Sequence, residues 1–229
     1  MNKRCIIIGA GHAASQLAMS LRQQGWQDDI LVIGDEVSLP YQRPPLSKSF
    51  LSGEKNREDI LIRPRKIYDD ANVSFRLDSR VASIDRKNKL IILQSGEEIG
   101  YSKLALCTGS RANKVSLPGN DKKGVHYLRN LEDAENIREN ALPGKHAIII
   151  GGGYIGLETA SALNQLGMQV TVLEAQDRIL KRVACPAVSD FFQRLHTQRG
   201  VKLVSNAFAA AIEGEQSVTG VSCQQGNLY

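Results

Sequence analysis

The sequence predicts an α/β fold built from two similar three-layer units, and two observations carry this prediction. Short runs of β-branched residues end in glycine-rich turns at two places, Gly9–Ala14 and Gly151–Gly156. After each turn, small and apolar residues recur at helical spacing, and a second buried strand follows. This order of strand, glycine turn, helix and strand is the βαβ start of a Rossmann-like unit. The chain has 229 residues, enough for two domains that each bury a core.

The first unit opens with the strand Arg4–Ile8, a glycine turn, a helix and the strand Ile30–Ile33. Gly9 permits the tight turn, Gly11 lets backbone N–H groups approach a pyrophosphate, and Ala14 allows close packing of the helix. An anion can then sit at the helix N-terminus. A carboxylate at the end of the second strand can accept a hydrogen bond from a ribose hydroxyl. The predicted cofactor contacts of this unit are Gly9, Gly11, His12, Ala13 and Asp35.

The second unit repeats this pattern, with strands at 147–150 and 170–173 on either side of a glycine turn and a helix. Two complete fingerprints are hard to explain as packing glycines, so we predict a dinucleotide at both. Glu174 favours NAD over NADP, because a carboxylate accepts from the ribose 2′-OH and repels a 2′-phosphate. The neighbouring Lys181 and Arg182 weaken this preference and could instead grip the pyrophosphate or bind nothing. The predicted contacts are Gly151, Gly153, Tyr154, Ile155, Gly156, Glu174 and Arg182.

Composition limits the other classes of function. No apolar run approaches the roughly 18 residues of a membrane span, so we predict a cytoplasmic protein without a membrane partner. The four cysteines are scattered and predict no metal site. The net charge is +5, and small basic clusters such as Arg63, Arg65 and Lys66 indicate a solvated surface or steering of an acidic protein. They lack interleaved aromatic residues, so nucleic acid is not a predicted partner.

The segment Leu39–Lys48 is a rigid loop, because Pro44 and Pro45 restrict its backbone. Ser47 or a neighbour is suited to cap a short helix that follows. Together with the first glycine turn and Gly34-Asp35-Glu36, its Arg-Pro-Pro-Leu-Ser-Lys sequence resembles the oxygenase-coupled NADH-ferredoxin reductases, within the glutathione-reductase-like FAD/NAD(P)-binding flavoproteins.

The resemblance implies an FAD-dependent oxidoreductase that passes electrons from NADH through FAD to a [2Fe-2S] ferredoxin or a similar small iron-sulfur protein. It places Lys48 beside the flavin ring, paired with Glu158 of the nicotinamide domain, as the catalytic pair. A fixed cation stabilises the reduced ring, and a carboxylate keeps that cation oriented. Further flavin contacts implied by the resemblance are Arg43, Val81, Thr108, Gly109 and Arg129.

The remaining pattern predicts strands at 72–76, 80–85, 89–93, 103–107, 201–204, 209–212 and 218–223, and a helix around 187–199. With a linker near 112–124, we predict an FAD-binding domain at 1–115 and an NAD-binding domain at 116–229. Compared with the resembled family, we expect the last strand of the nicotinamide domain, a second flavin segment and a C-terminal interface domain to be absent. The exposed sheet edge would then favour self-association.

Several alternatives stay open at this point. The acceptor could be rubredoxin or a quinone; a disulfide acceptor is disfavoured because the segment 39–48 has no redox cysteine. Outside the enzymes, the chain could be a catalytically silent nucleotide-binding remnant, or have an interaction role like that of the apoptosis-inducing-factor-like flavoproteins.

Overall fold

The computed structural model describes residues 3–229, which form two compact units. The first unit contains the chain up to Gln42 together with Arg57–Arg111, and the second contains Arg43–Asn56 together with Ala112–Tyr229. The segment Arg43–Asn56 belongs to the second unit because its Leu51 is fully buried in that unit's core. The predicted domain division after residue 115 stays a prediction. Among residues 3–229, no helix has the length and apolarity to cross a membrane.

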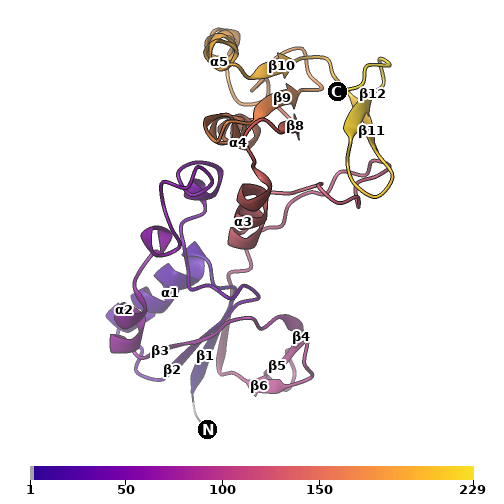
Figure 1. Cartoon of the computed structure of the whole chain (residues 1–229). Helices are drawn as coiled ribbons and strands as arrows, with labels where there is room; N and C mark the ends of the chain where they lie inside the picture. Colours follow the sequence, from indigo (N-terminus) through magenta and orange to yellow (C-terminus); the bar gives the residue numbers. More distant parts are fainter. Residues whose placement is uncertain (1–2) are drawn as a thin grey trace. The chain divides into compact units, whose positions relative to one another are not determined.

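The first unit is built around a parallel four-stranded sheet in the order β3-β2-β1-β7. Figure 1 labels β1, β2 and β3 of this sheet. Ile6 in the central strand β1 lies in register with Leu31 of β2 and Leu104 of β7. Because β1 has a neighbour on both sides, four of its five residues are buried. The strands are β1 (Arg4–Ile8), β2 (Asp29–Ile33), β3 (Val73–Arg76) and β7 (Lys103–Leu106).

Alternate residues of β1 divide the core of the first unit between two faces. Cys5 and Ile7 pack with Tyr68 of α2 and with α1, while Ile6 and Ile8 pack with Ile91 of a small antiparallel sheet. The parallel sheet is therefore the middle of three layers. The covering elements are α1 (His12–Gln23), α2 (Arg65–Asp70), β4 (Val81–Asp85), β5 (Leu90–Leu93) and β6 (Glu98–Gly100).

The second unit has the same layer order, around a parallel sheet with the strand order β10-β9-β8. One face packs with α4 through Ile149, Val170 and Val172, and the other packs with the antiparallel pair β11 and β12 through Leu173 and Val221. The strands are β8 (His146–Ile150), β9 (Gln169–Leu173), β10 (Lys202–Val204), β11 (Ala209–Glu213) and β12 (Gly220–Cys223). The helices are α3 (Leu131–Asn140), α4 (Tyr154–Gln165) and α5 (Pro186–Gln198).

Strand β8 forms one edge of this sheet. Within residues 3–229 it pairs with β9 alone, whereas its counterpart β1 has a neighbour on each side. As an edge strand, β8 is less buried than β1: none of its five residues is fully buried, and Ile150 is 40% exposed. Self-association through this edge stays a prediction.

The predicted α/β fold is confirmed, and most predicted strands lie within two residues of their observed bounds. The expectation for Ser47 is wrong. A 3-10 helix, η1 (Pro44–Ser47), ends at this residue, and turns follow it rather than a helix for it to cap. Two prolines begin η1, which their fixed backbone favours. A second 3-10 helix, η2 (Glu58–Ile60), was not predicted.

Candidate functional site

The first glycine turn leads from β1 into α1 and leaves room for a ligand. Gly9 has φ of 101°, and a Cβ on this residue would lie 2.2 Å from the carbonyl oxygen of Cys107, so only glycine fits. At Gly11, by contrast, a Cβ would have no heavy atom within 4 Å. Gly11 is also the N-cap of α1 and provides no side-chain cap. Open space beside uncapped N–H groups at a helix start fits a pyrophosphate.

The other predicted residues of this turn lie around the same opening. His12 and Ala13 are the first residues of α1 and are exposed. Thr108 and Gly109 follow β7 after Cys107, and the Cα of Thr108 lies 3.1 Å from the Cβ position of Gly9. The structure thus brings the end of β7 to the first glycine turn, as the resemblance implies.

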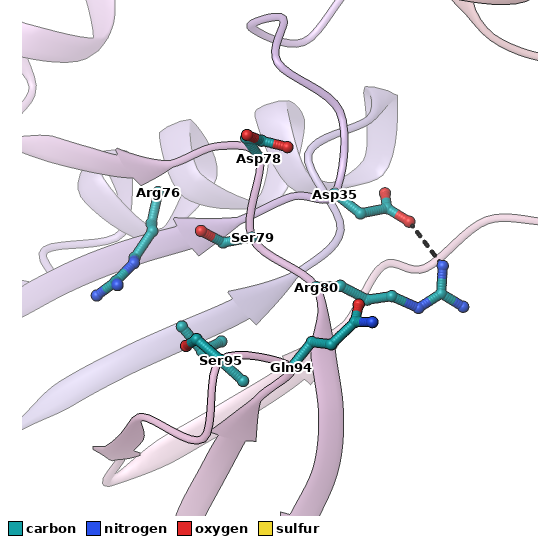
Figure 2. A pocket seen from close by; sticks show the side chains of 8 residues that line it. Asp35, Arg76, Asp78, Ser79, Arg80, Gln94 and Ser95 are labelled. Carbon is teal, nitrogen blue, oxygen red and sulfur yellow. Dashed lines mark hydrogen bonds and ion pairs between the residues drawn. The ribbon is translucent and has the colours of Figure 1, made fainter.

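A polar cavity of about 470 Å³ lies at the carboxyl ends of β2 and β3 (Figure 2). Oδ2 of Asp35 accepts a hydrogen bond from Nη1 of Arg80 at 3.4 Å, and both side chains are exposed. Oδ1 of Asp35 has no hydrogen bond to any residue in the described part of the chain, which leaves it open to a ribose hydroxyl. Val81 begins β4 immediately after Arg80. The lining residues are Asp35, Arg76, Asp78, Ser79, Arg80, Leu93, Gln94 and Ser95.

The second glycine turn repeats these features between β8 and α4. Gly151 has φ of 113°, and a Cβ at Gly153 would again meet open space. Gly156 lies in the first turn of α4, where a Cβ would lie 2.1 Å from the carbonyl oxygen of Gly151. Its role is therefore close packing of the helix on the turn. Tyr154 and Ile155 begin α4 and are 52% and 58% exposed.

Glu174 stands at the end of β9 with both carboxylate oxygens held by the backbone. Oε2 accepts from the N–H of Gly152 at 2.7 Å, and Oε1 accepts from the N–H of Gln176 at 2.8 Å. These bonds fix the carboxylate beside the glycine turn, where a ribose would lie. Arg182 is exposed and has no hydrogen bond or ion pair within residues 3–229, while Lys181 pairs with Asp177. Neither Lys181 nor Arg182 forms an ion pair with Glu174.

The predicted pair of Lys48 and Glu158 is formed within the second unit. Nζ of Lys48 donates to Oε2 of Glu158 at 2.7 Å and to the carbonyl oxygen of Pro44 at 3.2 Å. The hydroxyl of Ser47 donates to the same Oε2 at 2.6 Å. This third member was not predicted from the sequence. Its only signal was the position of Ser47 next to Lys48, which was explained as helix capping.

Arg43 and Arg129, two predicted flavin contacts, also meet within the second unit. Nη1 of Arg43 donates to the carbonyl oxygen of Arg129 at 2.8 Å. Arg129 precedes Asn130, the N-cap of α3, which forms a capping box with Asp133. The carboxylate of Asp133 also accepts from the N–H of Arg129 at 2.8 Å. The backbone that carries Arg129 is therefore held by a helix start.

A polar network between α1 and α2, which includes buried side chains, was not predicted. Nη1 of Arg63 donates to the hydroxyl of Ser15 at 2.7 Å, and this hydroxyl lies 2.7 Å from that of Tyr68. Nη2 of Arg63 donates to the Gln16 side chain at 3.2 Å. Ser15 and Tyr68 are fully buried. Arg63 therefore ties the first turn of α1 to α2 and is not part of a solvated basic cluster.

Comparisons with known proteins agree with this arrangement. The sequence model of the pyridine nucleotide-disulphide oxidoreductase family matches residues 3–229. A ferredoxin–NAD(P)(+) reductase from Sphingomonas sp is 44% identical over 197 residues, covering 86% of this chain and 47% of that protein. The rubredoxin-NAD(+) reductase of Pseudomonas putida is 39% identical over 209 residues, covering 91% of this chain and 54% of that protein.

A solved structure is similar over nearly the whole chain. The covalent complex of putidaredoxin reductase with putidaredoxin contains a chain with a TM-score of 0.91 and 35% identity. The match covers 99% of this chain and 56% of the solved one. The chain spans about half the length of the curated relatives it matches. The resemblance to ferredoxin reductases inferred from the motifs is confirmed.

Proposed function

Because the chain belongs to the pyridine nucleotide-disulphide oxidoreductase family, we propose that it is an FAD-dependent oxidoreductase that passes electrons from NADH to a [2Fe-2S] ferredoxin. The observation that carries this proposal is the Lys48–Glu158 pair, formed by side chains 110 positions apart in the sequence. Neither glycine turn requires such a pair in order to bind a nucleotide. A cation held by a carboxylate is suited to stabilise charge that develops during reduction.

In this proposal, the first unit holds FAD. The open space at Gly11 and the N-terminus of α1 bind the pyrophosphate. Oδ1 of Asp35 accepts from a ribose hydroxyl, while Arg80 keeps Oδ2 occupied. The backbone around Val81 provides a contact at the adenine end, and Thr108 and Gly109 provide further contacts, as the family resemblance implies. The 470 Å³ cavity beside Asp35 gives the adenosine end a polar surface.

The second unit holds NADH. Gly153 leaves room for the pyrophosphate, and the carboxylate of Glu174 accepts from the ribose hydroxyls. This carboxylate is fixed by two backbone N–H groups, so a 2′-phosphate would meet a negative charge that cannot easily move away. We therefore propose NADH rather than NADPH as the electron donor.

Bound FAD would accept a hydride from NADH and release electrons singly, which is chemistry that the cofactor supplies. The protein provides position and charge. Glu158 orients the Lys48 ammonium, and that ammonium would favour the negatively charged reduced flavin. Arg43 and Arg129, joined by the bond from Arg43 to the carbonyl oxygen of Arg129, are the other two residues of the second unit proposed to contact the flavin cofactor.

A small iron-sulfur protein is the proposed acceptor. The solved putidaredoxin reductase is similar over this chain, and it was captured with putidaredoxin. Rubredoxin is the second candidate, because a rubredoxin reductase is 39% identical. A cytoplasmic location stays a prediction.

The proposal is tested by the visible spectrum of the purified 229-residue chain. We expect flavin absorption bands after FAD is added, and we expect NADH to bleach them in the absence of oxygen. NADPH at the same concentration should bleach them much more slowly. A chain that binds no FAD, or whose bound flavin NADH does not bleach, would contradict the proposal and favour a catalytically silent nucleotide-binding role.

A further inference from the structure

We propose that Ser47 is a positioning residue that fixes the Glu158 carboxylate and, through it, the Lys48 ammonium; the catalytic part of this inference rests on the proposed function. The hydroxyl of Ser47 donates to Oε2 of Glu158 at 2.6 Å, and Nζ of Lys48 donates to the same oxygen at 2.7 Å. Two donors on one oxygen leave Oε1 without a hydrogen bond to any described residue. The carboxylate is thus held in one orientation from one side.

Ser47 is suited to this role because its own position is fixed. It ends η1, whose first two residues are prolines, and it is only 5% exposed. The next turn closes on Pro45, whose carbonyl oxygen accepts from the N–H groups of Lys48 and Phe50 at 2.9 and 3.0 Å. Phe50 is itself fully buried. A short side chain on this anchored backbone loses little rotamer entropy when it bonds Glu158.

Lys48 cannot fix the carboxylate equally well. Its side chain is 48% exposed and that of Glu158 is 30% exposed. An exposed ion pair gains little, because water screens the charges and two long side chains lose conformational freedom. The buried hydroxyl donor is thus the group that holds Glu158 in place, and Lys48 bonds a carboxylate that is already oriented.

A purely structural role for Ser47 gives a different expectation. The hydroxyl would then bond Glu158 only to satisfy its own buried donor. Replacing Ser47 would lower stability without changing the state of Lys48. The reactivity of Lys48 therefore separates the two possibilities.

The first test uses competitive acetylation of the 229-residue chain with limiting acetic anhydride, read by mass spectrometry as the ratio of Lys48 to Lys55. Lys55 is an exposed lysine of the same loop and forms no ion pair with any residue in 3–229. We expect Ser47→Ala to raise the ratio about threefold, a scale typical of coupled contacting groups. Glu158→Gln should raise it similarly, and the double variant should show no further rise. Ser47→Thr should restore the original ratio.

Ser52→Ala is the matched control, because the hydroxyl of Ser52 bonds Ser49 and Glu54 in the same loop rather than Glu158. It should leave the ratio unchanged. An unchanged ratio in Ser47→Ala, with the chain folded by circular dichroism, would overturn the positioning role. This readout needs neither FAD nor NADH.

The second test measures flavin reduction by NADH in a stopped-flow instrument. We expect Ser47→Ala to slow the reduction step about tenfold with little change in NADH affinity, and to have no further effect in a Glu158→Gln background. Rate losses that multiply in the double variant would show that Ser47 acts independently of Glu158. If the unmodified chain reduces no flavin, the proposed function fails, and the acetylation ratio still decides whether Ser47 positions the pair.

Discussion

Arg63 donates a hydrogen bond to the buried hydroxyl of Ser15 at 2.7 Å and thereby joins the loop before α2 to the first turn of α1. Ser15 in turn lies 2.7 Å from the hydroxyl of Tyr68, which is also fully buried. Removing the guanidinium leaves a buried network with one donor missing. The charged side chain of Arg63 therefore stabilises the first turn of α1, the helix that directly follows the glycine turn of the first unit.

We expect Arg63→Met to lower the free energy of unfolding of the first unit by about 1–3 kcal/mol, the cost of a lost hydrogen bond from a charged donor. Urea unfolding followed by the fluorescence of Trp26, the single tryptophan and a residue of this unit, measures the change. Arg65→Met is the control, because Arg65 is exposed and pairs with Asp69, and should cost at most about 1 kcal/mol. Equal losses in the two variants would argue against the network.

Gly9 and Gly11 should respond differently to alanine. At Gly9, the positive φ and the 2.2 Å approach to Cys107 mean that Gly9→Ala should destabilise the folded first unit itself. At Gly11, φ is −101° and the Cβ meets no protein atom within 4 Å, so Gly11→Ala should leave the urea midpoint nearly unchanged. Its methyl group would occupy the pyrophosphate space, and FAD affinity should fall about 100-fold or more, roughly 3 kcal/mol.

Fluorescence quenching of FAD on titration measures this affinity for the folded Gly11→Ala chain. Wild-type affinity in that variant would show that the open space at Gly11 is not the pyrophosphate site.

Local sequence patterns were sufficient for most of the strands and for the glycine turns, but not for the contacts that connect them. Strands β1, β2 and β9 were predictable because each is a mostly buried run rich in β-branched residues. Strand β8 was predictable from its three consecutive isoleucines, although none of its residues is fully buried. The six-residue helix α2 and the three-residue strand β6 were missed, because elements this short show no clear period.

The site residues likewise divide into those that a local motif predicts and those whose contacts depend on tertiary packing. Gly9, Gly151 and Glu174 follow from motif spacing, since a turn and the strand beside it are local. The bond of Ser47 to Glu158 spans 111 positions, and that of Arg63 to Ser15 spans 48. Such bonds depend on tertiary packing, which a local sequence pattern does not specify. From the sequence, the Ser47 hydroxyl could therefore be assigned only a local role, the capping of a following helix.

Glu174→Arg should change the nucleotide preference of the second unit. The variant loses the two hydrogen bonds that the N–H groups of Gly152 and Gln176 donate to the carboxylate, and it places a cation near the proposed ribose position. We expect NADH affinity to fall about tenfold or more, roughly 1.4 kcal/mol, and NADPH affinity to rise. Titration with each nucleotide by isothermal calorimetry measures both. Unchanged NADH affinity would remove Glu174 from the site.

The stability of the second unit should depend on pH through the titration of His196. This side chain of α5 is 9% exposed, and its pKa is lowered from the usual 6.5 by burial and then by the nearby charge of Arg199. The unfolded chain therefore binds a proton more readily than the folded one. Stability is full above about pH 6.5 and falls as the pH drops from 6.5 toward the lower pKa of the folded state.

We expect His196→Gln to flatten this dependence, because glutamine does not titrate. The measurement is amide hydrogen exchange of β9 and β10, whose core lies against α4 and α5, between pH 5 and 7.5. Exchange must be corrected for its intrinsic dependence on pH, and β1 in the first unit provides the internal reference. If the pH dependence of amide exchange in β9 and β10 persists unchanged in His196→Gln, the acid sensitivity belongs to another group of the second unit. If only the pH dependence of exchange in β9 and β10 is lost and β1 is unaffected, burial of one neutral imidazole in α5 sets the acid limit of the second unit.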